Sequence, residues 1–243
     1  LFACCSLWVQ AEDAPLWLRY PALSPDGREI AFTYKGDIYT VPAEGGRAVQ
    51  LTTNPRHDTR PVWSPDGRYI AFASDREGSF DVYLMAREGG TPRRLTTHSG
   101  NEYPETFKDN ETILFTASIR PDVKDSQFPS SLFPQIYAVG TKGGRPVLFS
   151  SLAMQELSLS RDGRRLLYQD QKGYEDPWRK HHQSSITKDI WLCTLDGERT
   201  YQKITRFAGE DREPVWSADG RSFYYLSEES GSFNVWKAAA DGS

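Results

Sequence analysis

The sequence has few cysteines and no long apolar run, and each shortage excludes a class of structure. Only three cysteines occur in 243 residues, and two of them, Cys4 and Cys5, stand near the N-terminus. If that segment is removed, Cys193 has no partner for an intrachain disulfide, so packing has to hold the fold. The apolar run at the N-terminus covers about nine residues, which is too short to span a bilayer.

The net charge is small, and recognisable catalytic motifs are missing. The net charge of −4 provides no field that would favour nucleic acid or an anionic membrane surface. The sequence lacks G-x-S-x-G, H-E-x-x-H, a phosphate-binding glycine loop and a Cys-His arrangement. The four histidines, His57, His98, His181 and His182, have no nucleophile marked beside them. We therefore predict no catalytic residue, metal ion or cofactor in this chain.

The first eleven residues, LFACCSLWVQA, have the order of a secretory signal peptide, with an apolar region followed by a small residue. We expect cleavage after Ala11, so that residues 12–243 form the mature domain in the periplasm or another exported location. Lipoprotein processing at Cys4 or Cys5 is one alternative, because the residues before them fit a lipobox loosely. A structural N-terminal strand is the other.

Aromatic residues, glycine and proline are abundant, and a repeated phrase organises them. The chain has 7 Trp, 12 Tyr, 12 Phe, 19 Gly and 15 Pro, a composition that favours strands and tight turns. A turn phrase occurs five times, as SPDG at 24–27, SPDG at 64–67, FKDN at 107–110, SRDG at 160–163 and SADG at 217–220. In SPDG, proline presets φ and glycine supplies the left-handed conformation that closes a hairpin. The phrase is therefore predicted to be structural.

Each phrase is followed by further strand-like segments in a fixed order. A strand such as DIYTV or DVYLM comes first, then a Gly-Gly or Asp-Gly turn, then a closing strand such as VQLTT. Four antiparallel strands repeated about every 40 to 57 residues predict an all-β fold, a β-propeller of four-stranded blades. Five repeats are visible and the last is truncated, with blades near 20–53, 60–97, 103–150, 156–206 and 213–243.

The repeat P-x-W/L-S-P-D-G-R-x-I-A-F, followed by D-I/V-Y, G-G and L-T, resembles the propeller repeat of TolB, tricorn protease and some prolyl-oligopeptidase relatives. The resemblance covers Trp17 to the C-terminus. The start of the domain and two long insertions look most like the first propeller of exported tricorn-like serine peptidases. That resemblance implies PDZ and peptidase domains that follow the propeller in the same parent chain.

Strand counting separates a turn rim from a loop-rich rim. The turn phrases and Gly-Gly turns fall together on the turn rim, and the middle loops and the connections between blades fall on the opposite, loop-rich rim. The loop-rich rim carries the irregular segments, at 54–60, 75–80, 98–103, 119–134, 171–188, 207–213 and 228–233. Because a rigid scaffold often presents recognition loops, we expect a peptide or protein to bind there.

One insertion on this rim, YEDPWRKHH, gathers aromatic and charged residues. Tyr174 and Trp178 could stack on a peptide, and Arg179 or Glu175 could pair with its termini. His181 is a further binding candidate in the same insertion, and a metal pair of His181 and His182 is a weaker reading because adjacent residues rarely bind one ion. The alternative is a surface loop whose tryptophan packs on a neighbouring blade. The Pro-rich insertion at 119–134 is either a lid or a covered edge.

Charged residues also recur just before the inner strands, where they would surround the mouth of the central channel. The candidates for peptide or partner binding in these connections and loops are His57, Asp58, Arg60, Asp75, Arg76, Glu102, Tyr103, Asp211 and Arg212. Mixed charge at this place could select peptide termini. The favoured alternative is that these side chains tie neighbouring blades together by ion pairs.

These observations predict a non-catalytic propeller that binds or gates peptides for a downstream serine peptidase domain. Two alternatives remain open: a TolB-like scaffold that docks envelope proteins on the loop-rich rim, and the propeller of a prolyl-oligopeptidase-type enzyme. The three differ in the domain that follows the propeller.

Overall fold

The computed structural model describes residues 17–118, 133–173 and 183–241, and these form five separate antiparallel sheets. Blade 1 contains β1 (Arg19–Leu23), β2 (Glu29–Tyr34), β3 (Asp37–Pro42) and β4 (Val49–Gln50). Blade 2 contains β5 (Asp58–Trp63), β6 (Tyr69–Ser74), β7 (Asp81–Ala86) and β8 (Gly89–Arg94). Blade 3 contains β9 (Glu102–Asp109), β10 (Thr112–Ala117), β11 (Gln135–Gly140) and β12 (Val147–Ser150). Blade 4 contains β13 (Met154–Leu159), β14 (Arg165–Asp170), β15 (Ile190–Thr194) and β16 (Thr200–Lys203). Blade 5 contains β17 (Asp211–Trp216), β18 (Ser222–Ser227) and β19 (Asn234–Ala239).

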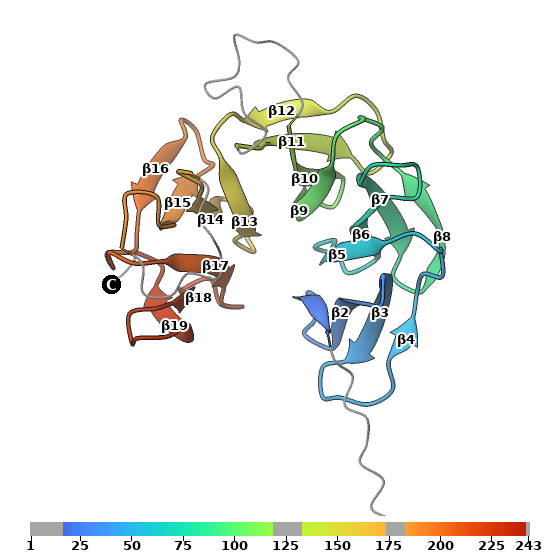
Figure 1. Ribbon diagram of the computed structural model, residues 1–243, viewed down its shortest axis with the longest axis horizontal. Coiled ribbons are helices and arrows are strands. Elements are labelled where there is room, and N and C mark those ends of the chain that lie inside the picture. The colour runs from blue at the N-terminus through green and yellow to red at the C-terminus, as the bar shows by residue number, and fades with distance from the viewer. Residues whose placement is uncertain (1–16, 119–132, 174–182, 242–243) are drawn as a thin grey trace, which may run out of the picture.

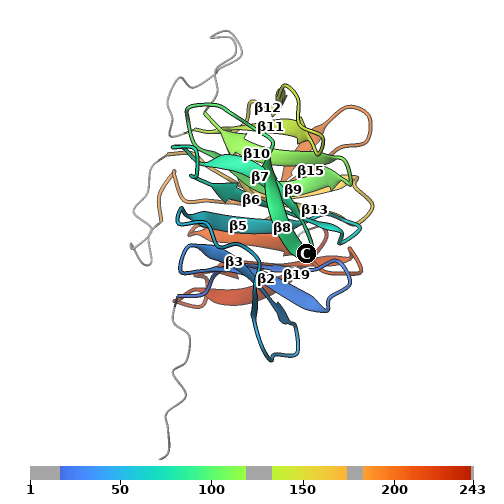
Figure 2. The same cartoon turned by 90° about the vertical axis from the view of Figure 1, so that its right-hand side faces the viewer.

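The five sheets are arranged around a common centre, with β5, β9, β13 and β17 innermost in their blades (Figure 1). Within each blade the strands follow one another in sequence order from the centre outward. The side view shows the blades stacked face against face (Figure 2). The predicted all-β propeller with a shortened fifth blade is thus confirmed.

The hydrophobic core lies between neighbouring blades, because alternate residues of each strand face opposite sides of a thin sheet. In β6, Ile70 packs in the cluster that blades 1 and 2 share, whereas Ala71 packs in the cluster that blades 2 and 3 share. Two similar clusters join blade 3 to blade 4 and blade 4 to blade 5. Cys193 on β15 is a free thiol buried in the former cluster. Blades 2, 3 and 4 therefore each share core clusters with both neighbouring blades.

The turn phrase forms a compact network of hydrogen bonds. In blade 2, the Ser64 hydroxyl donates to Asp66 Oδ1 over 2.7 Å and accepts from the Tyr69 backbone N–H over 2.9 Å. Gly67 has a φ of 69°, which a residue with a side chain rarely adopts. The phrases beginning at Ser24, Ser160 and Ser217 contain the same serine-to-aspartate bond.

Blade 3 departs from this pattern. The FKDN phrase was predicted to turn at 107–110, but β9 continues to Asp109 and the turn falls at Asn110 and Glu111. Phe107 stands where the other phrases have serine, so no hydroxyl can bond the aspartate and close the longer turn. The Glu111 backbone N–H instead donates to Asp109 Oδ1 over 2.9 Å.

Arginine side chains tie blades together near the turn rim. Arg87 of blade 2 pairs with Glu29 of blade 1 over 2.9 Å and lies over the Trp63 ring at 5.5 Å. In blade 4, Arg165 donates to the carbonyl of Gly220 in blade 5 over 2.8 Å. Contacts of this kind fix the angle between blades as well as their spacing.

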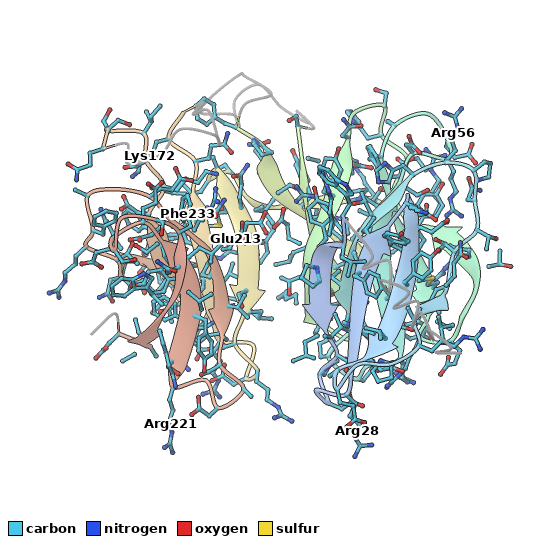
Figure 3. The ribbon with its side chains drawn as sticks, turned by 60° about the horizontal axis from the view of Figure 1, so that its bottom comes forward. Arg28, Arg56, Lys172, Glu213, Arg221 and Phe233 are labelled. Carbon is cyan, nitrogen blue, oxygen red and sulfur yellow. The ribbon has the colours of Figure 1, made fainter. Side chains whose placement is uncertain are left out.

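The two rims lie at opposite ends of the blades (Figure 3). Arg28 and Arg221 project from the turn rim, and Arg56 and Lys172 stand at the loop-rich rim. No helix in the described ranges is long and apolar enough to cross a membrane.

Candidate functional site

Each inner strand contains a β-bulge that turns one side chain toward the centre of the propeller. In blades 1, 2, 4 and 5 the ladder shifts register at this point, and the residues Tyr20, Arg60, Glu156 and Glu213 have φ between 50° and 55°. Left-handed backbone at residues other than glycine costs free energy and is common at functional sites.

Blade 3 places its bulge one residue later. Pro104 occupies the position of Arg60 in the blade alignment, and a proline ring cannot adopt a positive φ. Thr106 pairs with Leu114 and Pro104 with Phe115, so Glu105 is left without a ladder partner and becomes the bulged residue. All five inner strands therefore present a bulge near the centre, and three of the bulged residues are glutamates.

These residues line a cavity of about 720 Å³, here called the axial cavity. All five blades contribute to its wall, through residues 19–23, 60–63, 104–106, 156–159 and 213–215. Glu213 stands at the inner side of blade 5 in Figure 3. The inner strands, rather than the loops of the rims, thus form most of the cavity wall.

Arg60 is the central cation of the axial cavity. Its guanidinium lies 4.9 Å from the Tyr20 ring centre and 5.1 Å from that of Tyr103, so two aromatic faces enclose it. A guanidinium nitrogen stands 3.9 Å from Glu156 Oε1. Both partners of this ion pair are partly exposed, so water and an incoming ligand can reach them.

The glutamates around Arg60 differ in their surroundings. Glu105 accepts hydrogen bonds from the Thr116 hydroxyl and the Leu157 backbone N–H, each over 3.2 Å. Burial raises the pKa of Glu105, the negative charge of Glu156 raises it further, and Arg60 opposes both effects. Burial also raises the pKa of Glu213, again with a contribution from Glu156. The wall of the cavity carries charged groups of both signs, Glu105, Glu156 and Glu213 beside Arg19 and Arg60. The cavity therefore offers contacts to both cationic and anionic groups.

The predicted candidates divide between the axial cavity and the loop-rich rim. Arg60 lines the axial cavity, and the ring of Tyr103 stacks on the Arg60 guanidinium. On the rim, Arg76 donates to both carboxylate oxygens of Asp58 over 2.9 Å, and Asp75 Oδ1 accepts from the His57 backbone N–H over 2.8 Å.

These rim contacts lie within one blade. Asp58 begins β5 of blade 2 and Arg76 lies in the loop between β6 and β7, so their ion pair does not cross to another blade. Arg212 in β17 likewise stacks on Phe233 at 3.9 Å inside blade 5.

Glu102 and Asp211 are buried carboxyl groups at the start of inner strands, with exposed fractions of 0% and 1%. Burial, the largest cause, raises the pKa of Glu102 to about 7, and nearby Asp81 contributes to the rise. The remaining candidates, Tyr174, Glu175, Trp178, Arg179 and His181, lie outside the described residues, as does most of the 119–134 insertion.

Sequence reasoning missed Tyr20, Glu105, Glu156 and Glu213 as cavity residues. A usable signal was present in three blades, because the bulged residue stands directly before proline in Tyr20-Pro21, Arg60-Pro61 and Glu213-Pro214. Across the described ranges, no group of three or more His, Cys, Asp or Glu side chains is arranged to hold a metal ion.

Comparisons with known proteins agree with this architecture. A family model of the tricorn protease N-terminal β-propeller domain matches residues 15–243. Tricorn protease homolog 1 of Streptomyces coelicolor is 25% identical over 238 residues, which are 97% of this chain and 21% of that protein. The chain therefore spans about a fifth of this curated relative.

Two solved structures share the fold. The crystal structure of the tricorn protease superposes with a TM-score of 0.74 at 21% identity, covering 95% of this chain and 22% of that one. TolB from Acinetobacter baumannii superposes with a TM-score of 0.66 at 19% identity, covering 93% and 52%. At these identities the likeness concerns the fold alone.

Proposed function

The chain belongs to the tricorn protease N-terminal β-propeller domain family, and from that premise we propose that it is the non-catalytic, peptide-binding propeller of a serine peptidase. Its axial cavity binds or gates peptides for a catalytic domain that lies elsewhere in the parent chain. A PDZ domain accompanies that catalytic domain. The curated relative supports the idea of a longer parent, because this chain covers 21% of its length.

The observation that carries the proposal is the mixed charge of the axial cavity. Arg60, held between two tyrosine rings, is suited to a peptide carboxylate, because a guanidinium can donate two parallel hydrogen bonds. Glu156 and Glu213 are suited to the ammonium group at the other end of a short peptide or to a basic side chain. A cavity of about 720 Å³ is in the range that small ligands occupy.

Substitution within the cavity tests the proposal. We expect Arg60→Gln to weaken binding of a fluorescent peptide pool at least about tenfold, because a charge-assisted contact is lost. Fluorescence anisotropy measures the affinity, and circular dichroism verifies that the variant is folded. Arg28→Gln on the turn rim is the matched control and should leave binding unchanged. Equal affinities for Arg60→Gln and the unsubstituted chain would refute a cavity-centred site.

Export is the second part of the proposal. The apolar and small-residue order of residues 1–11 supports a secretory leader and a periplasmic or otherwise exported domain. Mass spectrometry of protein from the envelope fraction should find a mature N-terminus after Ala11. Recovery of the intact leader from the cytoplasm alone would contradict export.

A further inference from the structure

Blades 2 and 5 each have a buried aspartate at the same position, but only blade 2 also supplies a counter-ion for it. Asp58 opposes Ser74 in blade 2, and Asp211 opposes Ser227 in blade 5, so the two aspartates occupy equivalent ladder positions. Their exposed fractions are 0% and 1%. A buried carboxylate needs a paired charge or hydrogen bonds to offset its desolvation.

In blade 2 that partner is Arg76, two residues after Ser74. One guanidinium nitrogen lies 2.9 Å from each Asp58 oxygen, and the group lies over the Tyr83 ring at 4.6 Å and the Phe72 ring at 5.7 Å. The side chain thus fills a site with an acid on one side and aromatic rings on the other. In blade 4 the equivalent position also carries a cation, Lys172, which pairs with Asp189.

In blade 5 this position carries an acid. Two residues after Ser227 stands Glu229, so a carboxyl group replaces the guanidinium. The aromatic pair is retained, because Tyr225 opposes Trp236 as Phe72 opposes Tyr83. Blade 5 therefore keeps the acid and the rings of an arginine site but has no arginine at the corresponding position.

Asp211 is left without a counter-ion in the described ranges. Neither of its buried oxygens has a hydrogen-bond partner there; the Ser227 and Thr205 hydroxyls are near enough to lower its pKa but do not meet hydrogen-bond geometry. Burial, the largest cause, raises the pKa of Asp211 to about 6, with further contributions from Asp189 and Glu229.

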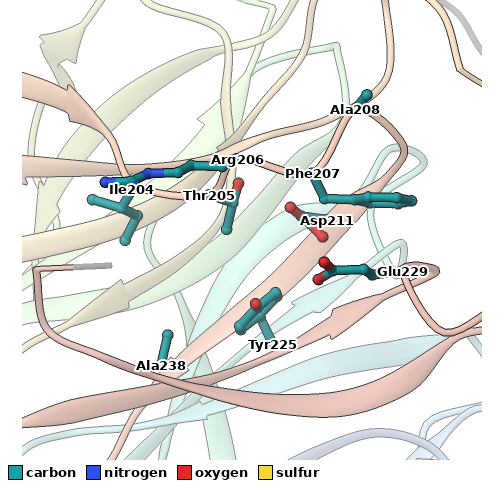
Figure 4. A pocket seen from close by; sticks show the side chains of 9 residues that line it. All are labelled: Ile204, Thr205, Arg206, Phe207, Ala208, Asp211, Tyr225, Glu229 and Ala238. Atoms are coloured by element: carbon teal, nitrogen blue, oxygen red, sulfur yellow. The ribbon is translucent and has the colours of Figure 1, made fainter. Parts of the chain in front are cut away.

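The space in front of Asp211 is a pocket of about 390 Å³. Figure 4 shows the carboxyl groups of Asp211 and Glu229 side by side with the Tyr225 ring beneath them. The segment 204–208, which follows β16, forms the opposite wall, and Arg206 and Phe207 lie in it. The pocket thus opens between blades 4 and 5 on the loop-rich rim.

Nearby cations are engaged elsewhere or turned away. Lys203 pairs with Asp189 over 2.7 Å, and Arg212 stacks on Phe233. Arg206 forms no ion pair with a described acid, and in Figure 4 its guanidinium extends away from Asp211 toward Ile204. Among the described residues, no nearby cation is therefore paired with the two acids in the pocket.

We propose that this pocket binds the guanidinium group of an arginine side chain carried by a peptide ligand. The group would bond to Asp211 and Glu229 and lie against Tyr225, repeating the geometry of Arg76 in blade 2. A planar guanidinium fits this arrangement better than an ammonium group, because it can bridge two carboxylates and stack on a ring. The peptide source of the arginine rests on the proposed function, whereas the pocket's affinity for guanidinium does not.

The direct test is a titration of the chain with Nα-acetyl-arginine amide, followed by NMR or calorimetry. We expect a dissociation constant of about 1 mM, as for a ligand of this size with one good polar anchor. The citrulline analogue, which is neutral and nearly the same shape, should bind at least about tenfold more weakly, as should the arginine probe to Asp211→Asn. Equal binding of the arginine and citrulline probes would overturn the proposal.

A second variant remains informative if Asp211→Asn fails to fold. Glu229→Arg should fill the pocket from within, raise the melting temperature and abolish binding of the arginine probe. Glu77→Arg is the matched control, because it makes the same charge change at the adjacent, exposed loop position of blade 2, beside a site that is already filled. Unchanged probe affinity in Glu229→Arg would also overturn the proposal.

The pocket and the proposed function can fail separately. Arginine-dependent peptide binding that is lost in Asp211→Asn and retained in Arg60→Gln would support the pocket while contradicting the axial cavity. Peptide binding that depends on Arg60 but is the same for arginine and citrulline peptides would support the axial cavity and contradict the pocket.

Discussion

At the first position of the inner strands, similar backbone surroundings hold carboxyl groups in three different states. Asp58 is neutralised by Arg76, and Asp211 lies near Glu229 with no counter-ion in the part of the chain that the structure describes. Glu102 is buried near Asp81, whose own partner is Arg94 at 2.9 Å. Between blades 2 and 5 the acid is the same, and the residue that differs is the one two positions beyond the second strand, Arg76 in one blade and Glu229 in the other.

The state of Glu102 predicts a pH dependence of stability. Its pKa is about 7 in the folded protein against 4.5 in an unfolded chain, so the folded state holds a proton between these values that the unfolded state has lost. Glu102 therefore makes stability fall as pH rises through this window. We expect Glu102→Gln to raise the melting temperature at pH 8 by about 2–4 °C relative to the unsubstituted chain, and by less at pH 5.

Calorimetry at the two pH values measures this difference. Glu111→Gln, in the exposed turn between β9 and β10, is the control and should shift neither melting temperature. A Glu102→Gln variant that is destabilised equally at both pH values would show that Glu102 is ionised and well paired in the folded protein.

Only some side chains of the axial cavity were predictable at the residue scale. Arg60 was a candidate because charged residues recur near the inner strands, although it lies within β5 and not, as was predicted, before it. Glu105 was not, because Pro104 moves the bulge of blade 3 by one residue and a one-residue shift reverses the face that a strand residue occupies. The absent cation beside Asp211 became visible only when ladder registers aligned Glu229 with Arg76.

At the scale of the element, the turn phrase fixes where the first two strands of a blade are joined. Its serine bonds to the aspartate two residues later and to the backbone five residues later, which closes the hairpin between the first two strands of a blade. These positions were predictable because local hydrogen bonding and the preference of glycine for positive φ act without tertiary contacts.

Removing the serine hydroxyl tests this role. Ser64 is fully buried, so Ser64→Ala loses two hydrogen bonds and leaves the Tyr69 N–H unpaired in the turn. We expect the free energy of unfolding to fall by about 1–2 kcal/mol in urea denaturation. Ser99→Ala, at an exposed position of the loop-rich rim, should change it by less than about 0.5 kcal/mol. If Ser64→Ala lowers the free energy of unfolding no more than this control does, the hydrogen bonds of the turn phrase do not stabilise the fold.

At the scale of the whole molecule, the hydrophobic core and the proposed binding surface occupy different places. The core lies between the faces of neighbouring blades, while the bulges of the inner strands surround the axial cavity. The repeat predicted the order of strands and the two rims, because it records which segments pair locally. It could not predict the contents of the axial cavity, which depend on how five separate strands converge.

Blocking the ends of a bound peptide tests the central claim most directly. Affinities for one short peptide are compared with its N-terminus free or acetylated and its C-terminus free or amidated. If Arg60 holds a carboxylate and the cavity glutamates hold an ammonium group, each block weakens binding at least about tenfold. Equal affinity for the free and the doubly blocked peptide would contradict recognition of peptide ends by the axial cavity.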